Sequence, residues 1–342
     1  MKILKYLLFV LLIIFIAGSI YIATQDGDYQ IEESRVIPAP VSLLYGEVSD
    51  LSTWGKWSYW GSEEEIVVNL SEPSTGETAG FSWENSEMGD GAITTQKLIP
   101  NSAIEQQLLM ETTFSDIKGT VYWKFEPAEG GTRVTWGIKD DLNFKEKLAL
   151  NLRDGNLNDL FEPKLQQGLE NLEENVKLQM EEYSINVDGV TQHSGGFFLY
   201  MTTASHTPEV YIRAQEMIEQ VSLYMEENNI SSAGKPFILY NQKDERSGTS
   251  IFSAAIPTSN QIITPVGSPV LNGFHPAQKA VKVSLRGNTK NAPEAWQAGY
   301  QYIDENGLEV NPEAEPFEVF YNNPAVEPNP ALWVTEIFIP VL

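Results

Sequence analysis

The sequence contains no cysteine, and it has only three histidines among its 342 residues. The absence of cysteine excludes disulfides, thiolate metal sites, cysteine nucleophiles and a lipid anchor attached to cysteine. His193, His206 and His275 are scattered along the chain without the spacing typical of metal ligands. We therefore expect no metal site and no cofactor, and we expect the three histidines to lie in loops or at the surface.

Basic residues are also scarce, since 22 lysines and arginines stand against 47 aspartates and glutamates, which gives a net charge of −25 at pH 7. Such a charge repels phosphate backbones and anionic lipid surfaces, so we expect no nucleic-acid partner. It attracts cationic ligands, although solubility alone is a sufficient reason for an acidic surface. No sequence feature identifies a protein partner.

A long apolar run occupies residues 3–23, which is about the length of a helix that crosses the hydrocarbon core of a membrane. Lys2 and Lys5 lie at its start and acidic residues follow it, which places the N-terminus in the cytoplasm and exports the soluble body to the periplasm or the exterior. We predict a single-pass anchor over residues 1–25. A cleaved signal peptide is the alternative, with residues 17–19 (AGS) as a cleavage site, and it also exports the body.

The next region, residues 28–184, is predicted to form one α+β domain. Strand-like alternation at residues 29–37 is followed by a helical stretch at 41–48 and then by five or six strand-like runs separated by turn residues. Residues 157–180 carry apolar side chains at spacings of three and four, the pattern of an amphipathic helix. The expected architecture is an antiparallel sheet wrapped around this long helix.

Short motifs give this region a resemblance to a known superfamily: PAP at 38–40, Asp50 and Leu51 with Trp54, Trp57 and Trp60, MGDG at 88–91, GGTRVTW at 130–136, and Phe161 with Leu169. It resembles the START-like (SRPBCC) superfamily of helix-grip domains, which includes polyketide cyclases. The resemblance implies an apolar cavity between sheet and helix. Trp83 and Trp123 are candidates to line that cavity, because alternate strand residues face the interior; the alternative is that they are core residues.

A polar stretch at 185–194 is predicted as a linker, and a degenerate repeat follows it in residues 195–342. Residues 224–230 (YMEENNI) precede PFILY at 236–240, and residues 302–308 (YIDENGL) precede PFEVF at 316–320. Each copy reads as strand, helix, strand and strand. Two such copies predict a pseudo-twofold domain, because neither unit could bury its apolar face alone. The copies differ where the first has Ile238 and the second has Glu318.

This second region carries its own set of motifs: GKPF at 234–237, AAIP at 254–257, Ala295 with Trp296, PFEVFY at 316–321 with Asn323 and Pro324, and TEIFIP at 335–340. On these motifs it is similar to the effector-binding (gyrase-inhibitor-like) domain found at the C-terminus of AraC-type and multidrug-responsive regulators. It departs from the family after Arg286 and Gly287, where the usual proline and aromatic residue are replaced by residues 288–290 (NTK).

The similarity implies a cleft between the two units that binds hydrophobic, often cationic molecules, with a buried glutamate as the counter-charge. Glu318 matches that glutamate, and Tyr200, Tyr240, Trp296, Tyr300 and Trp333 are the aromatic candidates to flank a ligand. About half of these aromatic residues are expected to be plain core.

Physical reasoning leads to the same residue. A strand places Glu318 and Phe320 on one face, and a buried carboxylate there costs several kcal/mol unless it has a partner. A ligand cation is one possible partner, with nearby rings adding cation–π attraction. The alternatives are an internal ion pair with Lys279, Lys282 or Arg286, and exposure of Glu318 at a frayed edge of the sheet.

Taken together, the sequence predicts a membrane-anchored protein with two hydrophobic pockets for small molecules, the second one for hydrophobic or cationic ligands held by Glu318. No set of residues indicates catalysis, so no catalytic residue is assigned. One alternative is an enzyme, either a hydrolase that uses Glu318 or a cyclase-like activity in the first pocket. Another is a scaffold whose pockets are filled by its own side chains.

Overall fold

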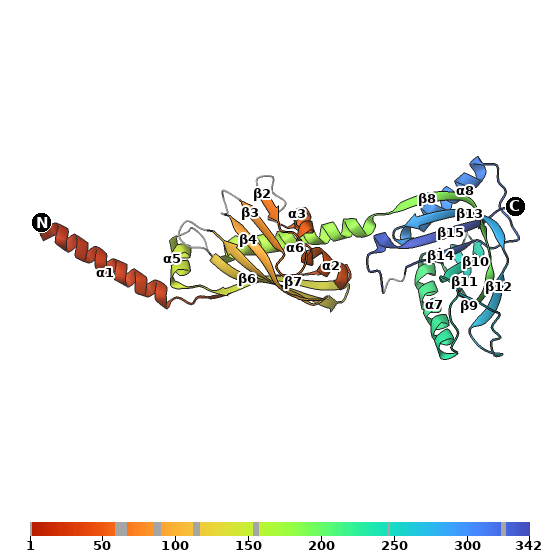
Figure 1. Ribbon diagram of the computed structural model, residues 1–342, viewed down its shortest axis with the longest axis horizontal. Helices are drawn as coiled ribbons and strands as arrows, with labels where there is room; N and C mark the ends of the chain where they lie inside the picture. Colours follow the sequence, from red (N-terminus) through yellow and green to blue (C-terminus); the bar gives the residue numbers. More distant parts are fainter. Residues whose placement is uncertain are drawn as a thin grey trace. The chain divides into compact units, whose positions relative to one another are not determined.

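The computed structural model describes residues 2–58, 67–84, 90–111, 117–152, 157–244, 247–322 and 326–342. Trp60, residues 88–89 and residues 323–324, which contribute to the resemblances above, lie outside these ranges. The chain divides into two compact units, Met1–Leu178 and Gln179–Leu342 (Figure 1). Each unit contains one antiparallel sheet with helices packed on it, so the fold class is α+β as predicted.

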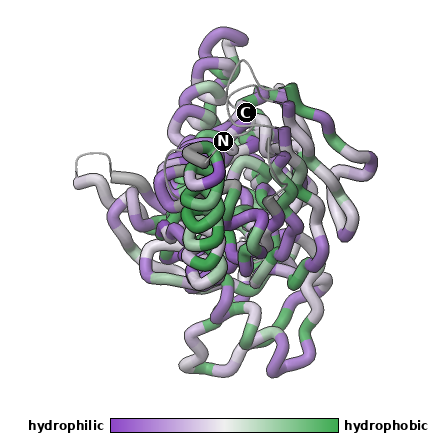
Figure 2. Tube along the Cα trace, turned by 90° about the vertical axis from the view of Figure 1, so that its left-hand side faces the viewer, coloured by the Kyte–Doolittle hydropathy of each residue, from purple (hydrophilic) through white to green (hydrophobic). Residues whose placement is uncertain are grey.

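Helix α1 (Lys2–Thr24) begins the chain and is apolar along nearly its whole length (Figure 2). Residues 4–24 are long and apolar enough to cross a membrane, and none of this segment is buried inside the protein. Both a membrane anchor and a signal sequence have these properties. The apolar helix itself is therefore as predicted, and its role belongs to the proposal below.

The first unit is built on a seven-stranded sheet in the order β1-β7-β6-β5-β4-β3-β2. Its strands are β1 (Asp28–Ile37), β2 (Val67–Leu70), β3 (Gly80–Glu84), β4 (Gly91–Ile99), β5 (Ala103–Met110), β6 (Ile117–Ala128) and β7 (Gly131–Asp141). Its helices after α1 are α2 (Val41–Ser49), α3 (Trp54–Trp57), α5 (Phe144–Leu152) and α6 (Leu157–Glu181).

Helix α6 is the long helix that the sequence predicts, and its apolar stripe is buried as expected. Phe161, Leu165, Leu169, Leu172 and Val176 are all at most 2% exposed. Close packing on the sheet requires a residue without a side chain at position 168. A Cβ atom on Gly168 would lie 2.5 Å from the ring of Trp136 on β7. The apolar stripe of α6 and the close approach at Gly168 together let this helix pack tightly on the sheet, which is the helix-grip arrangement.

The second unit is built on an eight-stranded sheet in the order β12-β9-β11-β10-β14-β15-β13-β8, with α7 (Val210–Glu227) and α8 (Ala292–Glu305) (Figure 1). Its strands are β8 (Ser184–His193), β9 (Gly196–His206), β10 (Phe237–Asp244), β11 (Thr249–Thr258), β12 (Leu271–His275), β13 (Gln278–Arg286), β14 (Phe317–Phe320) and β15 (Val334–Pro340).

The strand order of this sheet has the symmetry that the repeat predicts. From the centre outward, β10, β11 and β9 of the first copy mirror β14, β15 and β13 of the second. Strands β10 and β14 pair at the centre, where Ile238 lies directly opposite Glu318. The one telling difference between the copies therefore lies on the pseudo-twofold axis itself.

The two faces of this sheet bury different side chains. One face carries Ile238, Tyr240 and Phe252 against residues of α7 and α8, such as Ala214 and Trp296. We call it the helix face. The other face buries a separate cluster of aromatic and small residues that includes Phe198, Phe237, Phe317 and Phe338.

The predicted linker at 185–194 is wrong, because nearly all of it forms β8, an edge strand that pairs with β13. Ile185 and Val187 pack toward the helix face while their neighbours are exposed. An edge strand needs only one apolar face, so a mostly polar composition is compatible with it.

The expectation for the histidines is also wrong for two of the three. His275 ends β12 and is 6% exposed, and His193 ends β8 and is half-buried. His206 is exposed as expected, at the end of β9. The two strand-end histidines come together because β12 pairs with β9, which places His275 opposite Gly196, three residues after His193. Their ring centroids lie 5.7 Å apart.

Candidate functional site

Glu318 is the centre of the candidate site and is completely buried. Its Oε1 atom accepts three hydrogen bonds, from the hydroxyl of Tyr240 at 2.9 Å, the hydroxyl of Tyr211 at 3.1 Å and Nε1 of Trp296 at 2.6 Å. The three donors come from β10, α7 and α8, so both copies of the repeat contribute to the site. Neutral donors aimed at a carboxylate stabilise its charged form without a cation.

The two tyrosines remain donors over the physiological range. Burial, together with the charge of Glu318, raises the pKa of Tyr211 and of Tyr240 well above the ordinary value. Loss of either proton would place a second negative charge beside a buried carboxylate. The hydroxyls therefore stay protonated.

The lysines considered as partners for Glu318 bind elsewhere. Nζ of Lys282 forms ion pairs with Glu336 at 2.6 Å and with Asp188 at 3.6 Å. Nζ of Lys279 donates to the backbone carbonyl oxygen of Leu342 at 3.0 Å. Both lysines thus have partners at the surface of the sheet.

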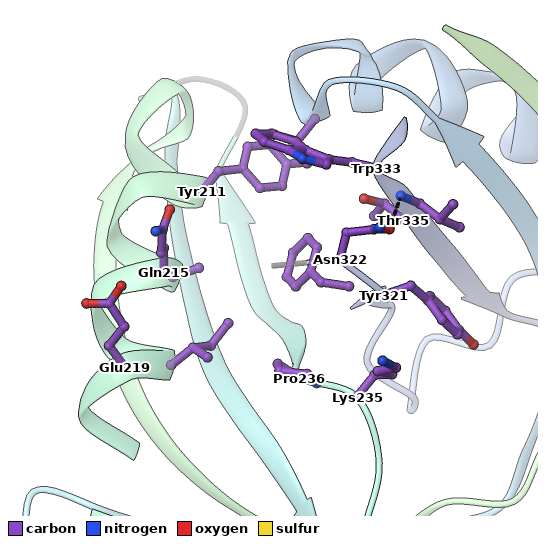
Figure 3. A pocket seen from close by; sticks show the side chains of 14 residues that line it. Tyr211, Gln215, Glu219, Lys235, Pro236, Tyr321, Asn322, Trp333 and Thr335 are labelled. Atoms are coloured by element: carbon purple, nitrogen blue, oxygen red, sulfur yellow. Dashed lines mark hydrogen bonds between the residues drawn. The ribbon is translucent and has the colours of Figure 1, made fainter. Parts of the chain in front are cut away.

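A cavity of about 370 Å³ lies beside this cluster, between α7 and the segments that follow β14 and precede β15. We call it the helix-face pocket. Figure 3 shows Tyr211 reaching from α7 toward Trp333, with Lys235 and Pro236 at the other end. Ile218 and Phe320 complete its apolar wall. Tyr211 lines the pocket and also donates to Glu318, so one side chain connects the cavity to the carboxylate.

The repeat explains why the cavity lies on this side of the axis. Counting back six residues from the aligned Tyr224 and Tyr302, Ile218 of α7 corresponds to Trp296 of α8. The indole of Trp296 packs against Tyr240 and reaches Glu318, whereas the smaller Ile218 lines the pocket. The sequence difference at this helix position therefore leaves space in one copy that the other copy fills.

The structure places the five predicted aromatic residues in four different settings. Tyr240 and Trp296 contact Glu318, and Trp333 lines the helix-face pocket while its Nε1 donates to the carbonyl of Glu327 at 2.9 Å. Tyr300 stacks on Trp296 with ring centroids 6.1 Å apart and is 45% exposed.

Tyr200 is not brought to Glu318. It packs with Phe198 on the face of the sheet opposite the helices, since Met201, the next residue along β9, takes the helix face. Alternation along a strand separates neighbouring side chains in this way.

Tyr211 was missed by sequence reasoning, although a signal for it exists. Tyr211, Gln215 and Ile218 are spaced by four and three residues, so they share one face of α7 and line the pocket together. That spacing predicts a shared face, but it does not indicate that the face borders a carboxylate 107 residues away.

In the first unit, Trp83 and Trp123 are at most 1% exposed and belong to a packed aromatic cluster. The rings of Trp123 and Trp136 stack with centroids 4.3 Å apart, and Nε1 of Trp123 donates to Oε1 of Gln106 at 3.1 Å. Trp54 lies within 6.3 Å of both stacked rings. Such contacts are typical of core residues, which was the alternative for Trp83 and Trp123. Ligand binding by these two residues stays a prediction.

Comparison with known families agrees with the two resemblances. Residues 29–177 match the family model described as polyketide cyclase/dehydrase and lipid transport. Residues 198–342 match the model described as a GyrI-like small molecule binding domain. Both matched regions therefore correspond to families associated with small molecules. No curated protein matches this chain in sequence.

Three solved structures each match less than half of this chain. The C-terminal domain of EcmrR is 18% identical, and the match covers 47% of this chain and 98% of that one with a TM-score of 0.38. Protein CV1439 from Chromobacterium violaceum is 14% identical over 43% of this chain and 95% of its own, with a TM-score of 0.33. Protein NE0264 from Nitrosomonas europaea is 13% identical over 44% and 94%, with a TM-score of 0.31.

Proposed function

Because this chain joins a polyketide-cyclase-like domain to a GyrI-like small-molecule-binding domain, we propose that it is a membrane-anchored binding protein for small hydrophobic cations. The ligand occupies the helix-face pocket, and Glu318 supplies the counter-charge. Helix α1 serves as the anchor and the body lies on the far side of the membrane, as the lysines at its start favour.

The observation that carries this proposal is a fully buried carboxylate next to an aromatic-walled cavity. Glu318 is 0% exposed, and one of its three donors, Tyr211, forms part of the pocket wall. Aromatic walls attract cations through the negative faces of their rings. A buried carboxylate attracts a cation far more strongly than a solvated carboxylate does, because the local dielectric constant is lower. A cavity of about 370 Å³ lies within the size range of roughly 300–1,000 Å³ found for small-molecule sites.

The excess of acidic residues also favours this ligand class. A net charge of −25 raises the local concentration of cations near the protein and lowers that of anions. Ligand entry requires Tyr211 and the start of α7 to shift, since Glu318 is closed off from solvent. A small movement of that helix end therefore couples binding to the shape of the second unit.

The test is a calorimetric titration of the full chain in lipid nanodiscs with N-methylquinolinium, a flat aromatic cation. Empty nanodiscs serve as the blank. Glu318→Gln keeps the shape of the side chain and removes its charge. We expect binding to weaken by about a hundredfold, because a desolvated ion pair is lost.

Glu219→Gln is the matched control, since Glu219 also lines the pocket but is exposed on α7. Its neutralisation should change the affinity less than about threefold, as is typical of solvated charges. Equal affinities of the parent protein and Glu318→Gln would show that the carboxylate has no such role. Absence of binding in the parent protein would favour the scaffold, and product released over time from a bound ligand would favour the hydrolase.

A further inference from the structure

A second cavity of about 370 Å³ lies on the face of the sheet opposite Glu318. We call it the opposite-face pocket. Phe198, Phe237, Phe317 and Phe338 line its wall together with His193 and His275. Because Phe317 and Glu318 are neighbours on β14, the same short strand contributes to a site on each face.

The rings of this pocket form one connected aromatic surface. Phe317 and Phe338 stack with centroids 4.6 Å apart and planes 5° from parallel. The His193 ring lies 4.7 Å from Phe317, and the His275 ring lies 4.9 Å from it. Phe317 and Phe338 are only 1% and 6% exposed, so they form the packed floor of the pocket, and aromatic walls of this kind favour a flat aromatic ligand.

The buried polar groups of the pocket carry little net charge at neutral pH, and the remaining charged group, Lys235, is exposed to solvent at the pocket wall. Burial lowers the pKa of His193, and burial together with the nearby His193 lowers the pKa of His275 to about 4, so both imidazoles are neutral. Glu336 is compensated, since it forms an ion pair with Lys282 at 2.6 Å and accepts a hydrogen bond from the Tyr321 hydroxyl at 2.7 Å. An ionic ligand would lose its hydration here without an equivalent partner.

One hydrogen bond fixes the tautomer of His193. The backbone N–H of Gly195 donates to Nδ1 of His193 at 3.2 Å, so the neutral ring carries its proton on Nε2. Nε2 of His193 is therefore a hydrogen-bond donor. A ligand that accepts a hydrogen bond at its edge uses this group, and a pure hydrocarbon does not.

We propose that the opposite-face pocket is a second ligand site, which takes an uncharged, flat aromatic molecule carrying a hydrogen-bond acceptor such as a phenolic oxygen. The Phe317–Phe338 stack forms the apolar floor beneath the ligand, and His193 donates a hydrogen bond to the ligand's edge. This proposal does not rest on the proposed cation site. The two pockets share Lys235 and Tyr321 in their walls, so each ligand is positioned to influence the other.

The test uses 2-naphthol as the neutral probe and N-methylquinolinium as the cationic one, each titrated by calorimetry against the full chain in nanodiscs with empty nanodiscs as the blank. Val319→Phe enlarges a half-buried residue of β14 that lines only the opposite-face pocket, and it keeps a side chain suited to a strand. We expect Val319→Phe to weaken 2-naphthol binding at least about tenfold. We expect Glu318→Gln to leave 2-naphthol binding unchanged.

His193→Phe provides a second variant, because it keeps a ring and removes the donor. The parent protein should bind 2-naphthol about tenfold more tightly than 2-methylnaphthalene, the value of one well-placed hydrogen bond, and His193→Phe should abolish that preference. An unchanged thermal unfolding midpoint shows that each variant is folded.

Three results would overturn the proposal: no 2-naphthol binding to the parent protein, undiminished binding to a folded Val319→Phe, or equal loss of 2-naphthol in Glu318→Gln. The last result would place both probes in the helix-face pocket.

Discussion

In the first unit, Trp123 and Trp136 stack at 4.3 Å, and the rings of Trp54 and Trp57 lie within 6.3 Å of both of them. In the second unit, Trp296 and Tyr240 lie against each other with ring centroids 5.6 Å apart, and both direct a polar atom at Glu318. In the first unit, large aromatic residues fill the interior by packing on one another. In the second unit, they donate hydrogen bonds to a buried carboxylate.

The difference shows what decides between a core and a site. An aromatic ring supplies apolar area and, in tyrosine and tryptophan, one polar atom that needs a partner when buried. Where the partner is a neutral amide, as Gln106 is for Trp123, the result is a packed interior. Where the partner is a carboxylate beside a cavity, the result is a negatively charged site that attracts a cation.

The largest effect expected is from Trp123→Ala. It should destabilise the first unit by about 3–5 kcal/mol, because a fully buried indole is replaced by a cavity. Hydrogen-exchange mass spectrometry of the full chain measures this loss in peptides of β6 and β7 and separates it from the second unit. Trp333→Ala is the control, since Trp333 is a half-exposed pocket wall and its loss should cost about 1 kcal/mol. A cost below about 1 kcal/mol for Trp123→Ala would mean that the first interior is not a packed core and would break the comparison.

A smaller effect is expected from Tyr240→Phe, which removes one donor to Glu318 and leaves the ring. A hydrogen bond to a charged group contributes about 1.5–3 kcal/mol, so peptides of β10 and β14 should lose protection by about that amount. Tyr321→Phe makes the same chemical change at an exposed site, where the hydroxyl donates to Glu336 at 2.7 Å. It should cost less than about 1 kcal/mol because solvent competes for both groups. Equal costs for the two variants would argue that Glu318 is not held as a buried charge.

The smallest effect concerns the shape of the helix-face pocket. Ile218→Trp makes α7 copy α8 at the corresponding position and should fill the cavity, weakening N-methylquinolinium binding about tenfold, or about 1.4 kcal/mol. Ile212→Trp on the same helix is the matched control, since Ile212 is 65% exposed and does not line the pocket. If Ile218→Trp bound the cation as tightly as the parent protein, the cation would have to lie elsewhere.

The sequence predicted the fold well wherever a local pattern repeats. The apolar stripe of α6 is buried and the apolar run at the N-terminus forms α1, because both are read from neighbouring residues. Prediction failed at 185–194, where a polar stretch was taken for a linker and forms an edge strand. One apolar residue in every two is a weak signal when the stretch is short and the other face is solvated.

The candidate site was predicted in part. Of the residues predicted to surround a ligand, the structure brings Tyr240 and Trp296 to Glu318 and places Tyr200 on the opposite face of the sheet, and Tyr211 was not predicted. The face of a strand depends on register, and a shift of one residue exchanges the faces. Sequence pattern alone does not fix that register for β9.

By itself, the sequence determined the pseudo-twofold design and the single carboxylate that breaks it, because both follow from aligning residues 236–240 with 316–320. Only the tertiary structure decided that this carboxylate lies on the axis opposite Ile238 and that three donors meet at one oxygen. It also decided that the free space lies beside Ile218 instead of Trp296. Those donors lie 22, 78 and 107 residues from Glu318, and contacts over such separations are set by packing and strand register, which no local pattern records.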